Sequence, residues 1–149
     1  TNNLPSLIDQ IRTLRDQLEA ALIDLGGVSV NGFHANRTPN VANITIEGVH
    51  NKTLIKLAKS IAFSLGSACN SASPKPSHVL KAMGLSDEQA NNTIRLSLSK
   101  FTTQDEINNT IHILGKAIRT IRNIKKSQTQ NGMVRSVSDR KNAPSLKVE

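Results

Sequence analysis

The chemistry available to this sequence centres on the thiol of Cys69, the only cysteine in the chain. Cys69 lies within residues 66–77, a stretch of small, polar and proline residues without a large apolar side chain. Because nothing in this stretch can anchor it in a core, we expect a mobile loop that exposes the thiol. Cysteine is usually buried, so this one is either a reactive nucleophile or an unreactive surface residue. His78 follows the loop, but its spacing does not establish it as a base for the thiol.

A second candidate is Arg95, which lies in the alternating segment 93–98. The alternation predicts a β-strand with apolar residues on one face and Arg95 and Ser97 on the other. If the polar face lines a cleft, the planar guanidinium can bind a carboxylate through two parallel hydrogen bonds. The alternative is a surface arginine whose aliphatic stem packs along the sheet.

Composition excludes several other kinds of site. One cysteine and four scattered histidines provide neither an internal disulfide nor the ligand spacing of a zinc site. The sequence has no glycine-rich phosphate motif, and its only aromatic residues are three phenylalanines, so stacking platforms for single-stranded nucleic acid are scarce. It contains neither a long apolar run nor a signal-like N-terminus, which favours a cytoplasmic protein without a membrane partner.

The net charge of +8 is concentrated near the C-terminal end. Residues 1–114 hold ten Lys and Arg against nine Asp and Glu, whereas residues 115–149 hold nine against two. A basic end can bind nucleic acid or an acidic protein. The alternative is a solvated helix end followed by a disordered terminus, and the loss of apolar periodicity after Asn123 predicts disorder over 124–149.

Apolar periodicity and capping residues predict the remaining elements. We expect long helices over about 5–25 and from 103 to 123, each with an apolar stripe. Three further short strands are predicted at 28–30, 41–47 and 61–64. Short helices are predicted to follow the capping residues Asn51, Ser77 and Ser86. Together these elements predict an α+β domain in which a small mixed or antiparallel sheet is covered by the two long helices.

Several motifs in this order resemble the C-terminal part of the pyridoxal-phosphate-dependent cysteine desulfurases of the class V aminotransferase family, specifically those with a long active-site loop. The resemblance covers about residues 4–122. It is carried by Thr38-Pro-Asn-Val-Ala-Asn-Ile-Thr-Ile, Ser64-Leu-Gly-Ser-Ala-Cys-Asn-Ser-Ala-Ser, Pro76-Ser-His-Val-Leu-Lys-Ala-Met-Gly-Leu, Ile94-Arg-Leu-Ser-Leu and Phe101-Thr-Thr.

The resemblance implies a function for both candidate residues. Cys69 matches the nucleophile that takes sulfur from L-cysteine, leaving alanine and an enzyme persulfide, and Arg95 matches the residue that binds the substrate carboxylate. The sulfur would then pass to an acceptor, such as an iron–sulfur scaffold protein, or serve tRNA thiolation. The resemblance also implies that the complete enzyme is a homodimer and that this chain has the fold of the small domain of fold-type I pyridoxal-phosphate enzymes. The active-site loop, within residues 64–77, would include the neighbours of Cys69, namely Gly66, Ser67, Ala68, Asn70 and Ser71.

The sequence also departs from the family. Ser97-Leu-Ser-Lys stands where the family usually has Ser-Leu-Gly-Arg, and the His-Lys pair of the cofactor domain does not occur. We therefore expect residues 1–123 to be the small domain alone, inactive without the cofactor domain, and residues 124–149 to be a basic tail. The competing interpretation is a degenerate, non-catalytic desulfurase domain that binds protein or nucleic acid through that tail.

Overall fold

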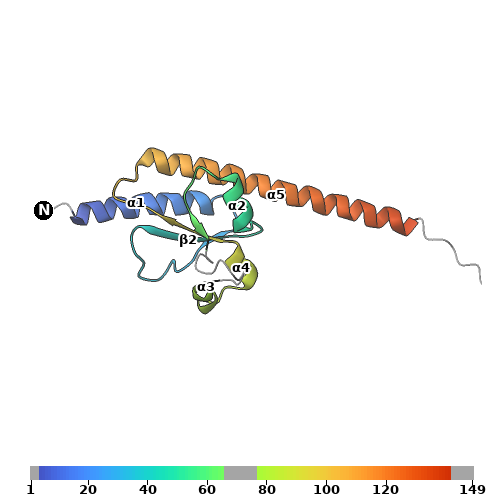
Figure 1. Cartoon of the computed structure of the whole chain (residues 1–149), viewed down its shortest axis with the longest axis horizontal. Coiled ribbons are helices and arrows are strands. Elements are labelled where there is room, and N and C mark those ends of the chain that lie inside the picture. Colours follow the sequence, from blue (N-terminus) through green and yellow to red (C-terminus); the bar gives the residue numbers. More distant parts are fainter. Residues whose placement is uncertain (1–3, 66–76, 142–149) are drawn as a thin grey trace, which may run out of the picture.

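The computed structural model describes residues 4–65 and 77–141, with side chains described up to residue 130. Figure 1 shows the arrangement of its helices and strands. The elements in chain order are α1 (Leu4–Ile23), β1 (Val28–Val30), β2 (Val41–Ile46), α2 (Asn51–Leu57), β3 (Ser64–Leu65), α3 (His78–Ala82), α4 (Asp87–Asn91), β4 (Thr93–Ser97) and α5 (Gln104–Lys141).

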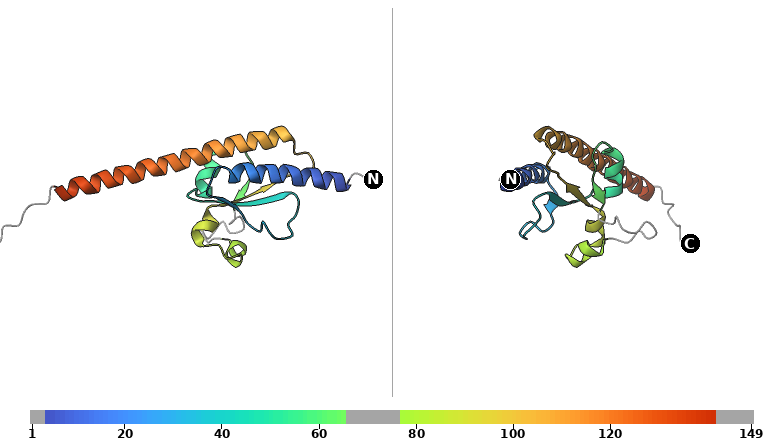
Figure 2. Two further views of the ribbon diagram at one scale, coloured as in Figure 1. Left: turned by 180° about the vertical axis from the view of Figure 1, so that it is seen from behind. Right: turned by 60° about the vertical axis from the view of Figure 1, so that its left-hand side comes forward.

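The four strands form one antiparallel sheet in the order β1-β2-β4-β3. The long helices α1 and α5 lie side by side against one face of this sheet, and α3 and α4 lie on the other side (Figures 1 and 2). This arrangement confirms the predicted α+β fold. The sheet separates an apolar layer under the long helices from a polar face that the short helices cover only in part.

The hydrophobic core lies between the sheet and the two long helices. Strand register places Ile44 opposite Ile94, so that alternate residues of β2 and β4 face the helices together. Both side chains are fully buried, as are Leu22 of α1 and Ile118 of α5. The apolar stripes that predicted the two helices are therefore the surfaces that pack on the sheet.

The predicted helix starts are confirmed where the sequence contains a capping box, in which two residues bind each other's backbone N–H groups. Ser86 and Gln89 form the predicted capping box of α4. Thr103 and Glu106 do the same for α5, since each backbone N–H donates to the other side chain. Asn51, by contrast, does not cap α2: the cap is His50, whose side chain accepts from the Lys52 backbone.

The cap of α2 and the bounds of β3 differ from the prediction, because contacts with residues distant in the sequence determine both. Asn51 is the first residue of α2, and its buried side chain is turned toward β4, where Nδ2 donates to the Thr93 carbonyl oxygen at 3.1 Å. The third strand is Ser64–Leu65 rather than 61–64, because pairing with Ile94 and Arg95 defines where the edge strand begins. Ser77 precedes α3 as predicted, but its side chain makes no capping hydrogen bond.

The prediction of disorder from residue 124 is wrong for 124–141, where α5 continues beyond the domain (Figure 2). The side chains of residues 124–130 are all exposed, so no apolar stripe is needed over that part of the helix. Helix propensity does not end, because lysine, glutamine and arginine favour helix and no proline occurs from residue 124 to residue 143. Residues 142–149, and the predicted loop over 66–76, lie outside the described residues.

Among the described residues, no helix is long and apolar enough to cross a membrane.

Candidate active site

The candidate site lies on the polar face of the sheet, opposite the hydrophobic core. Side chains alternate between the two faces of a strand, so the residues between the core-facing positions form the second face. Registered pairs place Ser29 beside Thr45, Asn43 beside Arg95, and Ser64 beside Arg95 on the other side. A continuous row of hydroxyl, amide and guanidinium groups therefore crosses all four strands.

Arg95 is the only cation in this row, and its side chain is exposed. Within the described residues its guanidinium makes no hydrogen bond or ion pair, while its backbone carbonyl accepts a bond of 3.5 Å from the Ser64 hydroxyl. The predicted orientation of Arg95, away from Ile94 and Leu96, is confirmed by their burial in the core. The guanidinium is thus available to an anionic ligand.

Amide and hydroxyl groups beside Arg95 form a connected hydrogen-bond chain. The Asn31 Nδ2 group donates to Asn43 Oδ1 at 2.8 Å and to Thr45 Oγ1 at 2.9 Å. Thr45 Oγ1 lies 2.7 Å from Thr93 Oγ1, which in turn donates to the Gln89 carbonyl at 2.7 Å. Thr93 is completely buried, so this chain anchors the polar face to α4. The alternation in the sequence predicts that the strand residues share a face, but it does not predict the hydrogen bonds that connect them.

The predicted loop with the nucleophile Cys69, together with Gly66, Ser67, Ala68, Asn70 and Ser71, lies outside the described residues. Its point of departure is described: β3 ends at Leu65, one position after Ser64, the partner of Arg95. The chain therefore leaves the sheet for this loop directly beside Arg95.

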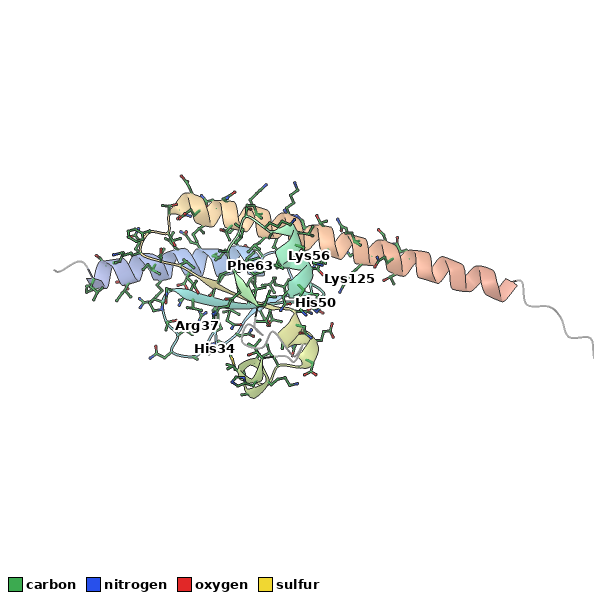
Figure 3. The ribbon with its side chains drawn as sticks, viewed as in Figure 1. His34, Arg37, His50, Lys56, Phe63 and Lys125 are labelled. Carbon is green, nitrogen blue, oxygen red and sulfur yellow. The ribbon has the colours of Figure 1, made fainter. Side chains whose placement is uncertain are left out.

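The histidines do not form a cluster. His34 lies in the loop after β1 and His50 caps α2, so they come from different parts of the domain (Figure 3). His78 begins α3 with an exposed side chain, and His112 is exposed on α5. No group of three or more His, Cys, Asp or Glu residues suited to a metal ion occurs within the described ranges.

A buried ion pair supports the loop that begins with Asn31, and sequence reasoning missed it. Arg37 Nη1 and Nη2 donate to Glu19 Oε1 and Oε2 at 2.7 and 3.1 Å. The hydrogen bonds to Glu19 raise the pKa of Arg37 above its ordinary value. The guanidinium also lies 5.7 Å from the centre of the Phe33 ring. The one available signal was an acidic residue beside the apolar stripe of α1, next to Leu18.

The described residues do not fit the pyridoxal phosphate that the resemblance implies. A lysine that forms a Schiff base sits against the bound cofactor, whereas every described lysine is exposed. No glycine-rich phosphate loop opens a described helix. The polar face can bind a carboxylate through Arg95, but these residues do not hold the cofactor.

Comparisons with known proteins show which family the chain resembles. The aminotransferase class-V family matches residues 4–110. Cysteine desulfurase IscS of Serratia proteamaculans is 42% identical over 121 residues, which are 81% of this chain and 30% of that protein. The IscS of Escherichia coli is 41% identical over 117 residues, 78% of this chain and 29% of that protein. The chain therefore spans about 30% of the length of these relatives.

Solved structures show the same relationship. The structure of a NifS-like protein from Rickettsia africae superposes with a TM-score of 0.67 at 27% identity. The match covers 78% of this chain and 30% of that protein, as in the sequence comparisons.

Proposed function

The chain belongs to the aminotransferase class-V family, and we propose on that premise that it is the small domain of a pyridoxal-phosphate-dependent cysteine desulfurase. The observation that carries the proposal is the exposed guanidinium of Arg95, which has no partner among the described residues and lies beside the strand from which the Cys69 loop departs. In this proposal the loop that carries Cys69 begins beside the cation that binds the carboxylate.

Each of the two residues has one role in the proposed reaction. Arg95 binds the carboxylate of L-cysteine through its planar pair of N–H donors and so orients the substrate. The thiolate of Cys69 attacks the substrate sulfur: an S–S bond forms and the Cβ–S bond of the substrate breaks. The electron pair left on Cβ takes up a proton, which gives alanine, and the sulfur stays on Cys69 as a persulfide.

The remaining parts of the proposed enzyme lie outside this chain. Pyridoxal phosphate would be held by a second domain, since the described lysines are all exposed. We propose that Gly66, Ser67, Ala68, Asn70 and Ser71 let the loop carry Cys69 from the substrate to a sulfur acceptor. The complete enzyme would be a cytoplasmic homodimer serving iron–sulfur cluster assembly or tRNA thiolation.

The test supplies the missing domain in trans. The purified chain is mixed with the cofactor-binding part of the Escherichia coli relative and L-cysteine, and the mass of the chain is measured without reductant. One added sulfur atom, located on Cys69 by peptide mapping and absent from Cys69→Ala, is expected. A chain that gains no sulfur, although the two parts co-purify, contradicts the proposal.

A second candidate function is that of a non-catalytic binding module. The observation in its favour is that α5 continues beyond the domain with Lys125 and Lys126 exposed and without an acidic residue from 107 to 138. Binding of nucleic acid by this helix would weaken steeply with salt and disappear when residues 124–149 are removed. Sulfur would then not appear on Cys69 in the mixing experiment.

A further inference from the structure

We propose that Asn43 is a second carboxylate-binding residue, which acts beside Arg95, and that Asn31 positions it. This inference rests on the proposed function, because it assigns the substrate carboxylate to two side chains instead of one. Asn43 would donate an amide N–H to the same carboxylate that Arg95 binds.

Strand order places Asn43 between its positioning residue and Arg95. The order β1-β2-β4 puts β2 in the middle, with Asn31 just after β1 on one side and Arg95 on β4 on the other. Asn43 is the registered partner of Arg95, and neighbouring residues of this kind have Cβ atoms about 5 Å apart. One carboxylate can therefore contact both side chains.

The hydrogen-bond chain determines which end of the Asn43 amide faces the ligand. Asn31 uses both Nδ2 protons, one to Asn43 Oδ1 at 2.8 Å and one to Thr45 Oγ1 at 2.9 Å. A donor on Asn31 requires an acceptor on Asn43, so the oxygen of Asn43 faces β1 and its Nδ2 group faces away from β1. The Asn31 backbone N–H also donates to the Asn43 carbonyl at 2.8 Å, which keeps the two residues together.

The position of Asn31 is itself enforced by the hydroxyl groups behind it. The single hydroxyl proton of Thr93 goes to the Gln89 carbonyl at 2.7 Å, so Thr45 is the donor in the 2.7 Å bond between the two threonines. Thr45 Oγ1 is then an acceptor for Asn31. Its alternative acceptor, Asn31 Oδ1, is farther away at 3.3 Å. The hydrogen bonds therefore have one consistent direction, in which the Nδ2 group of Asn31 faces Thr45 and Asn43.

The donor end of Asn43 is accessible. Its Nδ2 group has no hydrogen-bond partner within the described residues, and no buried side-chain nitrogen or oxygen among them lacks a partner. Asn43 as a residue is partly exposed, so its side chain reaches the surface of the polar face. The Asn43 amide and the Arg95 guanidinium are registered neighbours on the polar face, and neither donor group has a partner among the described residues. Such a pair suits a carboxylate, which accepts several hydrogen bonds.

The test uses the complete chain alone and does not depend on sulfur chemistry. Sodium propionate is titrated into the isotope-labelled chain at constant ionic strength, and NMR follows the side-chain signals of Asn43 and Arg95. Propionamide, similar in shape but uncharged, is the matched ligand control. Both side-chain signals are expected to shift along one binding curve with propionate and to stay unchanged with propionamide.

Variants separate binding from positioning. Asn43→Ala should raise the Kd for propionate about tenfold, since it removes a hydrogen bond to a charged group. Asn31→Ala should raise it about threefold, because the Asn43 amide gains rotational freedom. Asn43→Asp keeps the bond from Asn31 but places a negative charge beside Arg95, so binding should be lost. Asn123→Ala, on the exposed surface of α5, should leave the Kd unchanged.

Backbone spectra confirm that each variant is folded before its Kd is compared. A shift of Arg95 without Asn43, an unchanged Kd in both Asn43→Ala and Asn43→Asp, or no shift at either residue overturns the inference. Failure of the proposed function is a separate result: the chain would bind propionate through both residues and still acquire no persulfide in the mixing experiment.

Discussion

The carboxylate of Glu19, only 2% exposed as a residue on α1, accepts two hydrogen bonds from the guanidinium of Arg37 in the loop after β1. This pair connects α1 to the loop that begins with Asn31, and so helps to hold that loop in place beside the polar face. It is the one buried ion pair whose two partners come from different elements within the described residues.

Glu19→Gln should destabilise the domain by about 3 kcal/mol, because removing one member of a buried pair leaves the other charge uncompensated. Urea unfolding followed by circular dichroism measures the change. The matched control is Asp9→Asn, which breaks the exposed pair with Arg12 and should cost less than about 1 kcal/mol. Equal costs for the two variants would contradict a structural role for the Glu19–Arg37 pair.

The contribution of the Glu19–Arg37 pair to the free energy of unfolding should not change through ionisation of Arg37 between pH 6 and about pH 9. The pKa of Arg37 is raised in the folded state by its hydrogen bonds to Glu19. A raised folded pKa gives stability that is complete below the unfolded pKa and is lost only as the pH rises through the folded value. Both values lie far above neutrality, so a difference in stability between wild type and Arg37→Gln that changes over this range would contradict the assignment.

Gly27→Ala should destabilise the domain more than Gly26→Ala. Both glycines have positive φ, +58° and +74°, so alanine is strained by about 1 kcal/mol at either position. Only at Gly27 would the added Cβ crowd other groups, at 3.0 Å from Arg122 Nη2 and 3.2 Å from Glu47 Oε2. That crowding would disturb the bonds from Arg122 to the Leu25, Gly27 and Glu47 carbonyls, and we expect about 1 kcal/mol of additional loss. Thermal unfolding of the pair of variants measures the difference, and equal melting temperatures would refute it.

Arg95→Lys should separate binding from stability. Because the side chain is exposed, the free energy of unfolding should change by less than about 0.5 kcal/mol. In the enzyme reconstituted with a cofactor domain, KM for cysteine should rise about tenfold, since lysine cannot form the two parallel bonds. Lys116→Arg, which changes an exposed cation on α5, is the control and should leave KM unchanged. An unchanged KM in Arg95→Lys would argue against carboxylate binding by Arg95.

Removal of residues 124–149 should lower the helical signal without lowering the stability of the domain. The side chains of residues 124–130 are all exposed and none belongs to the core, so they contribute little apolar burial. Circular dichroism at 222 nm should decrease, while the urea midpoint should stay the same. A lower midpoint would show that this part of α5 packs on the domain.

Much of the fold could be predicted because its signals are local. The apolar stripes of α1 and α5, and the alternation that buries Ile44 and Ile94, depend on residues close together in the chain. Capping boxes are local as well, which explains why Ser86 and Thr103 behaved as predicted. Asn51 did not, because its amide binds the carbonyl of Thr93, which lies far along the sequence.

The residues that could do chemistry, and the strand face that they share, follow from the order of residues along the chain: the thiol of Cys69, the position of Arg95 on a polar face, and the family resemblance that links the two. The neighbours of Arg95, Asn43 on one side and Ser64 on the other, follow from strand pairing in the folded domain. The pairing of Glu19 with Arg37 likewise arises only in the folded domain. The physical reason is that strand order and register depend on how the whole core packs between the sheet and the two long helices, whereas side-chain periodicity depends only on the local backbone.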